Sequence, residues 1–413
     1  MTRWRIERLG RRGDGVAVAV AGEARALAPL TLPGEEIEGE AEDGRIAAPR
    51  TVAPSAQRVA AACPHYRACG GCALMHGSND FVASWKVGVV QAALAAQGIA
   101  APVALAHVSP PRSRRRAVLS GRRTKKGALL GFHRRFSDVV VDLADCMVLR
   151  PAIIAALPDL RRLVVMGGSR SAELALTVTE TLAGLDVAVQ GGKPMEPGLF
   201  AQLAALAREA GWARLVWGDE PLLLRPPEVQ FGRARVVLPP GGFLQATAEG
   251  EAALLAAVRA IVGDAARIAD LFAGAGTFTL PLAERAEVHA VEGLAAPLSA
   301  LDAGWRAAPG LRRVTTETRD LARRPLLPDE LARFDAVVID PPRTGAAAQA
   351  AALAESLVPL VAWVSCDPVT FARDARRMIE GGYAIGPVGV VDQFRWSPHV
   401  ELTAAFMRQR PSR

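Results

Sequence analysis

The chain has 413 residues, half of them hydrophobic, with a formal net charge of +7. At roughly one domain per 150 residues, this length predicts about three domains. No apolar run is long enough to span a membrane, and the start of the chain lacks the apolar core of a signal peptide, so we expect a cytoplasmic protein without a membrane partner. The positive charge fits a polyanionic partner.

Residues 1–50 are expected to form a small β-barrel. Residues 16–20 are a strand-like apolar run, and turn signals lie at residues 13–15 and 32–35. Small barrels of the OB type often bind single-stranded nucleic acid. From these residues alone, a barrel that only packs on its neighbour is an equally good interpretation.

Cysteine usage is uneven. Cys63, Cys69 and Cys72 form C-x5-C-x2-C, Cys146 follows much later, and Cys366 stands alone. Three clustered thiols and one distant thiol predict four ligands around a metal centre, because soft thiolates select zinc or iron–sulfur clusters. Taken alone, Cys146 would be a structural cysteine. The wide first gap favours iron–sulfur over zinc, whose paired ligands usually lie closer together.

The next segments carry a helix and a basic run. Residues 79–97 predict a helix with Phe81, Trp85, Val89 and Leu94 on one face. Between Arg112 and Arg135 there are ten Arg and Lys residues and no acidic residue. A phosphate-bearing partner is therefore favoured over a merely solvated basic face. The run is Arg112, Arg114, Arg115, Arg116, Arg122, Arg123, Lys125, Lys126, Arg134 and Arg135.

The rest of the chain divides into two parts. Residues 137–240 predict an α+β region with strands near 139–141, 174–178 and 187–189 and a helix over 199–210. A Pro-Pro-Gly-Gly boundary at 239–242 precedes alternating helices and strands up to about residue 408. That alternation predicts a mostly parallel, doubly wound α/β sheet.

Three strands of this sheet end in residues that can react or bind a ligand. The strand 267–271 leads into a glycine turn at residues 272–276, the strand 334–339 into Asp340-Pro341-Pro342-Arg343, and the strand before Ser365 into Cys366. In open α/β sheets, ligands bind at the carboxyl ends of the strands. A nucleotide-type cofactor beside a nucleophile is the predicted combination.

The glycine turn is a weak signal by itself. A G-x-G turn after a strand also occurs in dinucleotide enzymes, but Thr279 stands where their third glycine would be. Glu292, at the end of the next strand, is placed to hold ribose hydroxyls, although it also fits a surface carboxylate. Asp320, after a strand at 313–316, is a weaker candidate for an adenine contact.

Asp340 and Cys366 together favour methylation of a carbon atom. Amino-group methyltransferases often place an aromatic residue after Asp-Pro-Pro, and this chain has Arg343 there. An amine needs no enzyme nucleophile, whereas carbon 5 of uracil becomes reactive only after a thiolate adds to carbon 6. The thiolate needs activation, for which Arg343 or the helix start at Pro368 are candidates. Glu401 is the candidate base for the carbon 5 proton, with His399 as its rival.

These motifs resemble the bacterial RNA 5-methyluridine methyltransferases, and most closely the TRAM-domain, iron–sulfur type that modifies 23S rRNA. The resemblance covers nearly the whole chain. It is carried by Ile6–Gly39 as the TRAM barrel, the four cysteines, Arg114–Ser120, Phe243-Leu244-Gln245, Asp270–Phe278, Asp340–Arg343, Ser365–Pro368 and His399-Val400-Glu401. It implies a class I, Rossmann-like methyltransferase domain after an OB-like (TRAM) barrel and an α+β iron–sulfur central domain.

The resemblance also implies roles for single residues. Cys366 is the nucleophile and Glu401 the base; Cys63, Cys69, Cys72 and Cys146 bind a [4Fe-4S] cluster; and Arg114, Arg115, Arg116, Arg122 and Arg123 face RNA. The expected contacts of S-adenosylmethionine are Gln245, Phe272, Gly274, Thr277, Glu292, Asp320 and Asp340. The implied domains are 1–50; 51–74 with 108–242; and 75–107 with 243–413. The target uridine would be flipped out of its stack.

Departures from the family pattern leave the substrate open. Asp367 replaces the usual Asn, and residues 245–247 and 394–398 also differ from the usual motifs. We expect rRNA as the target, with tRNA as the alternative. A non-catalytic iron–sulfur RNA-binding protein and a methyltransferase acting on another atom are further alternatives, and a redox enzyme ranks lower. We expect a monomer, because no coiled-coil pattern occurs.

Overall fold

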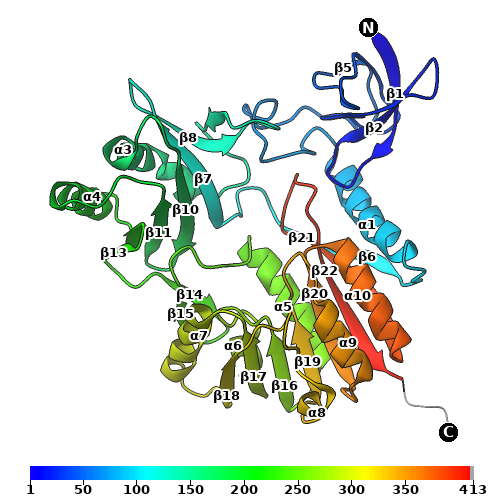
Figure 1. Ribbon diagram of the computed structural model, residues 1–413, viewed down its shortest axis with the longest axis vertical. Helices are drawn as coiled ribbons and strands as arrows, with labels where there is room; N and C mark the ends of the chain where they lie inside the picture. The colour runs from blue at the N-terminus through cyan, green and yellow to red at the C-terminus, as the bar shows by residue number, and fades with distance from the viewer. Residues whose placement is uncertain (410–413) are drawn as a thin grey trace.

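The computed structural model describes residues 1–409, which form four β-sheets. In Figure 1 the N-terminal sheet is blue and the central sheet runs from cyan to green, while the large sheet runs from yellow-green to red apart from the cyan β6. Among the described residues, no helix combines the length and apolar character that a membrane crossing requires.

The N-terminal sheet has five antiparallel strands in the order β3-β2-β1-β4-β5. Side chains alternate between its interior and solvent, as a half-buried strand requires. Trp4, Ile6, Ala17 and Ile37 fill the interior. The strands are β1 (Thr2–Leu9), β2 (Gly15–Ala19), β3 (Arg25–Ala28), β4 (Glu36–Gly39) and β5 (Arg50–Ala53).

The central sheet has seven strands in the order β13-β12-β11-β10-β7-β8-β9, and α3 packs on β7 and β8. The predicted strands near 139–141, 174–178 and 187–189 and the helix near 199–210 are confirmed. The elements are β7 (Arg116–Arg123), β8 (Ala128–His133), β9 (Val140–Asp142), α2 (Pro151–Ala155), α3 (Leu157–Gly167), β10 (Leu174–Thr181), β11 (Gly184–Gln190), α4 (Pro197–Glu209), β12 (Arg214–Trp217) and β13 (Glu220–Leu223). A two-stranded ribbon, β14 (Glu228–Phe231) with β15 (Ala234–Val237), follows.

The large sheet has eight strands in the order β18-β17-β16-β19-β20-β22-β21-β6. The first five are parallel, and β22 is antiparallel between β20 and β21. The elements are β6 (Val103–Val108), α5 (Ala248–Val262), β16 (Arg267–Leu271), α6 (Thr279–Leu282), β17 (Glu287–Glu292), α7 (Ala295–Ala307), β18 (Val314–Thr318), α8 (Pro328–Leu331), β19 (Ala336–Ile339), α9 (Ala347–Glu355), β20 (Leu360–Ser365), α10 (Pro368–Glu380), β21 (Tyr383–Asp392) and β22 (Glu401–Arg408). The predicted mostly parallel α/β sheet is confirmed.

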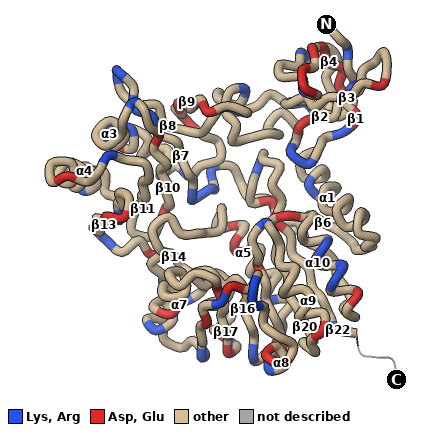
Figure 2. The backbone as a smooth tube through the Cα atoms, viewed as in Figure 1, with Lys and Arg blue, Asp and Glu red and all other residues tan. Residues whose placement is uncertain are grey.

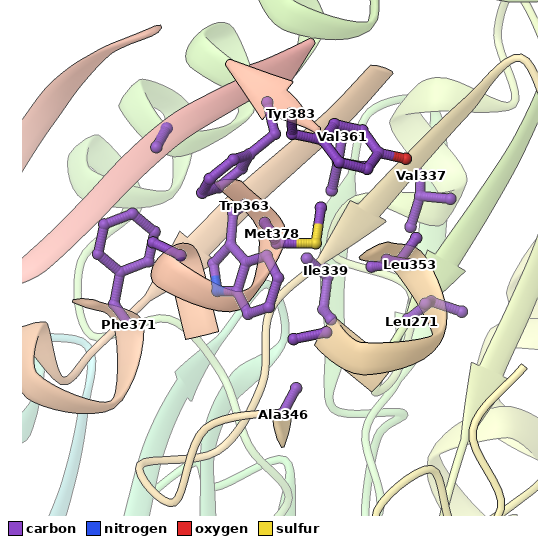
Figure 3. Close-up of a cluster of buried hydrophobic side chains, with 14 of the residues drawn as sticks. Leu271, Val337, Ile339, Ala346, Leu353, Val361, Trp363, Phe371, Met378 and Tyr383 are labelled. Atoms are coloured by element: carbon purple, nitrogen blue, oxygen red, sulfur yellow. The ribbon is translucent and has the colours of Figure 1, made fainter. Parts of the chain in front are cut away.

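Helices cover both faces of the large sheet. Side chains of α9 and α10 pack on one face, where Trp363, Phe371 and Phe406 meet edge to face or tilted (Figure 3). Side chains of α5 and α7 pack on the other face. Burial on both faces explains why β19 and β20 read as continuous apolar runs rather than alternating ones.

An early segment of the chain completes this sheet. The helix α1 (Asn79–Ala95) packs on α10, and β6 pairs in parallel with β21. The predicted helix is confirmed, and Leu94 is buried as expected, but the other buried positions are Val82, Lys86 and Val90 rather than the predicted Phe81, Trp85 and Val89. Phe81 and Trp85 are only partly buried, because they pack against a separate small cluster around Leu74.

Candidate active site

Cys366 lies directly after β20, where the strand ends and the chain turns into α10. Its neighbour Asp367 caps the helix and accepts hydrogen bonds from Val369 N (2.9 Å) and Thr370 N (3.2 Å) at Oδ1. Asp367 therefore occupies the amide donors that were expected to activate the thiol. Cys366 is half-buried.

The thiol is not activated in the free protein. Burial, followed by the charges of Glu401 and Asp340, raises the pKa of Cys366 to about 12. Arg343 lowers this pKa, as expected of a neighbouring cation, but its effect is outweighed. The expectation that Arg343 or the helix start activates the thiol is therefore not met in this state.

Glu401 is the first residue of β22 and is 3% exposed. Burial, followed by the Asp340 charge, raises the pKa of Glu401 to about 8, while a hydrogen bond with Gln393 opposes the increase. Among the described residues, its Oε2 atom is buried without a hydrogen-bond partner. A buried carboxyl group with an unsatisfied oxygen and a high pKa has the properties of a group that can accept a proton from a bound substrate.

Asp340 follows β19, and burial raises its pKa to about 7. Its Oδ2 atom accepts a hydrogen bond from Gln245 Nε2 at 3.3 Å, and Gln245 Oε1 accepts one from Gln393 Nε2 at 2.6 Å. Gln393 also lowers the pKa of Glu401, so the two glutamines link the surroundings of the two carboxyl groups. The ends of β19, β20 and β21, the start of β22 and the segment before α5 thus bring one thiol, two carboxyl groups and two amides together.

His399, the rival base, lies beside Arg343. Its ring nitrogens are 3.3 and 3.4 Å from Arg343 Nη2, and its ring packs edge to face on Phe394. Burial, followed by the charges of Arg343, Lys86 and Arg114, lowers the pKa of His399 to about 4. His399 is therefore a much weaker base than Glu401.

The glycine turn after β16 has the backbone of a ligand-binding loop. Phe272 and Gly274 have φ values of 61° and 56°, in the left-handed region. A Cβ atom on Gly274 would meet nothing within 4 Å, so its backbone faces open space. Glu292, at the end of β17, accepts hydrogen bonds from Gly274 N and Leu294 N, both at 3.1 Å. This carboxylate fixes the turn.

The two remaining candidates for cofactor contact differ in exposure. Thr277 is half-buried in the turn before α6. Asp320 follows β18, as predicted, but is exposed and lies 3.5 Å from Arg323. Glu292 and Asp320 follow neighbouring strands, so both carboxylates are at the same edge of the sheet as Asp340 and Cys366.

The four thiols of the predicted metal site line the same cavity, although Cys146 is distant in the sequence. Cys63, Cys69, Cys72 and Cys146 line a single cavity of about 360 Å³. Burial and the neighbouring thiols raise the pKa of Cys72 to about 12. In residues 1–409, no group of three or more His, Cys, Asp or Glu side chains is arranged to hold a metal ion.

The predicted RNA-facing arginines divide into two groups. Arg114, Arg115 and Arg116 are partly buried and bonded within the protein: Arg115 pairs with Glu251 at 2.5 Å, and Arg116 donates to Gly242 O at 3.0 Å. The other two, Arg122 and Arg123, are at the tip of the β7–β8 hairpin, one of the basic segments visible in Figure 2. Binding RNA through Arg115 or Arg116 would require these internal bonds to break.

Two adjoining cavities lie at and beside the thiol. A cavity of about 180 Å³ is lined by Cys366, Arg11, Arg12 and Arg343, among others. A larger one of about 610 Å³ shares Arg12 and Arg343 with it. Figure 2 shows the basic loop between β1 and β2, which brings the barrel to the site. The sequence did not indicate this contribution of the barrel, because Arg11 and Arg12 form only a short basic pair.

Other residues at the site were also missed. Lys86, fully buried on α1, donates to Asp392 Oδ1 at 2.5 Å and to Phe394 O at 3.1 Å. Trp396 O accepts from Ala73 N at 2.8 Å. Both contacts fix the loop before Glu401, and no local sequence signal reports pairs so far apart in the chain.

The strand order, the glycine turn after β16 and the acid at the end of β17 define an α/β enzyme that binds a nucleotide-type cofactor at the carboxyl ends of its strands. A model of the family described as tRNA (uracil-5-)-methyltransferase matches residues 307–409. The 23S rRNA (uracil(1939)-C(5))-methyltransferase RlmD of Halomonas elongata is 35% identical, over 96% of this chain and 87% of that protein. The chain belongs to the S-adenosylmethionine-dependent RNA uracil-C5 methyltransferases.

Two further similarities span the whole chain. An uncharacterized RNA methyltransferase of Mesorhizobium japonicum is 44% identical, over 100% of this chain and 99% of that protein. The crystal structure of Pyrococcus abyssi tRNA (uracil-54, C5)-methyltransferase with S-adenosyl-L-homocysteine has a TM-score of 0.74 at 21% identity, covering 98% of this chain and 99% of that one. The second similarity shows that the arrangement of all parts of the fold is shared.

Proposed function

We propose that this protein methylates carbon 5 of a uridine in structured RNA through a covalent adduct with Cys366. The observation that carries the proposal is the convergence of a thiol with two carboxyl groups of raised pKa at adjoining strand ends. An amine-directed enzyme would need neither the thiol nor the second acid.

The chemistry follows from the uracil ring. The Cys366 thiolate adds to carbon 6, and the electron pair of the carbon 5–carbon 6 double bond makes carbon 5 a nucleophile. S-adenosylmethionine supplies the methyl group that carbon 5 takes, and its sulfonium is a positive charge that favours thiolate and carboxylate. Glu401 then removes the carbon 5 proton, the carbon 6–sulfur bond breaks, and Cys366 leaves as a thiolate.

Glu401 is proposed as the base rather than His399. A base with a pKa of about 8 retains a proton far better than one with a pKa of about 4. Glu401 must first lose its own proton, which the arriving positive charge promotes. Gln393 supports the carboxylate through its hydrogen bond.

The cofactor is proposed to lie along the ends of β16, β17, β18 and β19. Gly274 leaves open space for close backbone approach, and Glu292 is placed for ribose hydroxyls. Gln245 and Asp340 would lie beside the reactive end, and Asp320 beside the base. The proposed contacts are Gln245, Phe272, Gly274, Thr277, Glu292, Asp320 and Asp340.

The four thiols are proposed to hold a [4Fe-4S] cluster. Their chemistry fits, because iron–sulfur clusters take four cysteine thiolates, and they line one cavity. A cubane holds its ligands further apart than a single ion does. The cluster would be structural. The residues around it, 51–74 and 108–242, are proposed as the central domain, between the barrel of 1–50 and the methyltransferase domain of 75–107 and 243–413.

The proposed target is 23S rRNA, supported by the printed name of the Halomonas relative. The second candidate is tRNA, which the description of the matching family favours. In either RNA the uridine would have to leave its stack to reach a partly buried thiol, at a cost of a few kcal/mol. Arg122 and Arg123 would contact the RNA backbone, and the protein would act as a monomer.

The deciding experiment uses RNA that contains 5-fluorouridine. Fluorine cannot leave carbon 5 as a proton does, so the adduct with Cys366 should persist and migrate as a protein–RNA band under denaturing conditions. Cys366→Ala should abolish the band, whereas Cys63→Ala, outside the reacting groups, should retain it wherever the protein folds. A wild-type protein that binds the RNA and cofactor without forming the band would refute the mechanism.

The target is identified in a separate experiment. Unmodified 23S rRNA and tRNA transcripts are incubated with methyl-labelled S-adenosylmethionine, and the labelled nucleotide is mapped. Label at a uridine of rRNA alone supports the first target, and label in tRNA alone the second. Label on a base other than uridine, or at another atom, would refute the proposed reaction.

A further inference from the structure

The larger cavity beside the active site is a groove built from four parts of the chain. It is lined by Arg12 and Asp14 from the loop after β1, by residues 70, 71 and 73 of the cysteine loop, by residues 132–136 at and after the end of β8, and by Arg343 with residues 397–399 from loops of the large sheet. Because Arg12 and Arg343 also line the Cys366 cavity, the groove adjoins the cavity that holds the thiol. A chain segment that delivers a base to Cys366 would lie in it.

The groove is organised for a polyanion. Arg12, Arg134, Arg135 and Arg343 line it, and the one acidic residue among its lining residues is Asp14, which is 5% exposed. Burial raises the pKa of Asp14, and the charges of Arg135, Arg45 and Arg12 lower it, so three arginines surround one buried carboxyl group. The excess positive charge faces the groove, where phosphates would release counterions.

Phe136 stands out among these basic residues. It is 63% exposed, and the guanidinium carbon of Arg45 lies 4.0 Å from the centre of its ring. Its φ of 56° places a bulky residue in the left-handed region, where such residues are strained. Glycine would adopt this turn without strain. The turn therefore retains an aromatic ring that is stacked on one side and largely open to solvent.

We propose that Phe136 is a stacking platform for a nucleobase next to the target uridine, and that the groove arginines hold the flanking phosphates of an unpaired RNA segment. The inference rests on the proposed uridine methylation and specifies the kind of RNA. An aromatic side chain can stack only on a base whose face is free, so the groove would select a loop, bulge or end rather than a duplex.

The test compares variants of two exposed phenylalanines. Phe136→Ala is matched by Phe200→Ala, because Phe200 is 44% exposed on α4 and does not line the groove. The probe is a single-stranded RNA oligonucleotide with one uridine flanked by 2-aminopurine, whose fluorescence falls when it stacks on an aromatic ring. Phe136→Ala should weaken binding by about 5- to 150-fold and remove the quenching. Phe136→Tyr should restore both, and Phe200→Ala should change neither.

A third substitution of Phe136 separates its effect on RNA recognition from its effect on folding. Phe136→Gly relieves the left-handed strain, so it should raise the melting temperature while it weakens RNA binding as much as Phe136→Ala does. A structural role for the ring would lower stability and affinity together. With saturating RNA, the kcat of Phe136→Ala should stay near that of the wild type while KM rises.

Three results would each decide a different part of the proposal. Equal affinity and quenching for the wild type, Phe136→Ala and Phe200→Ala would overturn the stacking inference, even for an active methyltransferase. If the wild type quenches the probe but forms no 5-methyluridine on any RNA, the proposed reaction fails while the quenching still supports the platform. Equal affinity for a perfect duplex and the single strand would overturn the selection of unpaired RNA.

Discussion

Gln393 Nε2 donates a hydrogen bond of 2.6 Å to Gln245 Oε1, although the two residues are 148 positions apart. Both side chains are almost fully buried. Gln393 also lowers the pKa of Glu401, and Gln245 donates to Asp340 Oδ2 at 3.3 Å. The proposed base and the proposed cofactor contact are therefore not independent groups, because one buried amide chain fixes both.

Replacing Gln393 should impair the last step of the reaction. Gln393→Leu removes a donor that favours the Glu401 carboxylate, so the pKa of Glu401 rises. The acid limb of the profile of kcat against pH therefore moves to higher pH. A hydrogen bond to a charged group contributes about 1.5–3 kcal/mol, so we expect kcat at neutral pH to fall by about 10- to 100-fold. Because elimination is slowed, the covalent complex with ordinary uridine RNA should accumulate on denaturing gels.

The matched control for that variant is Gln230→Leu, which changes an exposed glutamine on β14 that bonds only to Gly232 O at 3.0 Å. It should leave the pH profile and the amount of complex unchanged. If Gln393→Leu lowers kcat but leaves both readouts at wild-type values, the side chain only supports packing.

Stability should respond to pH through Glu401. Its pKa rises from 4.5 in the unfolded chain to about 8 in the fold, so between these values the folded state binds more protons. Stability therefore falls as pH rises through this window, by up to about 1.4 kcal/mol per pH unit for this group. Glu401→Gln has no such proton. In urea unfolding, its free energy of unfolding should therefore rise relative to that of the wild type from pH 5 to pH 8. The exposed Glu23→Gln should parallel the wild type.

The buried pair of Lys86 and Asp392 should be costly to break from one side. Lys86→Met leaves an uncompensated carboxylate, which costs about 3–5 kcal/mol. Lys86→Met with Asp392→Asn should recover much of that loss in urea unfolding. Arg376→Met, on neighbouring α10, breaks an exposed pair with Glu380 and should cost below about 1 kcal/mol. Comparable losses in both single variants would contradict a special role for the buried pair.

Two cysteine variants should differ in their effects. Gly70 N, next to Cys69, donates to His133 O at 2.9 Å, whereas Ala73 N and Leu74 N, after Cys72, donate to Trp396 O at 2.8 and 2.9 Å. Both Cys69→Ser and Cys72→Ser should lower bound iron. Cys69→Ser should mainly cost folding or RNA affinity, and Cys72→Ser should also lower kcat, because it loosens the loop before Glu401. Iron content, Kd and kcat are measured on the same anaerobic preparations, and identical profiles would contradict the difference.

The positions of Cys366, Asp340 and Glu292 followed from the sequence, because buried parallel strands are apolar runs and their ends share one edge of the sheet. Lys86 and Gln393 did not, since their partners are 306 and 148 positions away. The arginines at 114–116 show the same limit. The sequence around them contains no acidic residue, but Arg115 pairs with Glu251, which is distant in the sequence. A local count of charges therefore did not predict that Arg115 is neutralised within the protein.

The pairing of β6 with β21 also bears on synthesis of the protein. The ribosome releases β6 and α1 long before it releases β21. At about 5–20 residues per second, the nascent edge strand waits for tens of seconds without its neighbour. During translation this segment is therefore a candidate for binding by chaperones, and the large sheet can be completed only once β21 has left the ribosome.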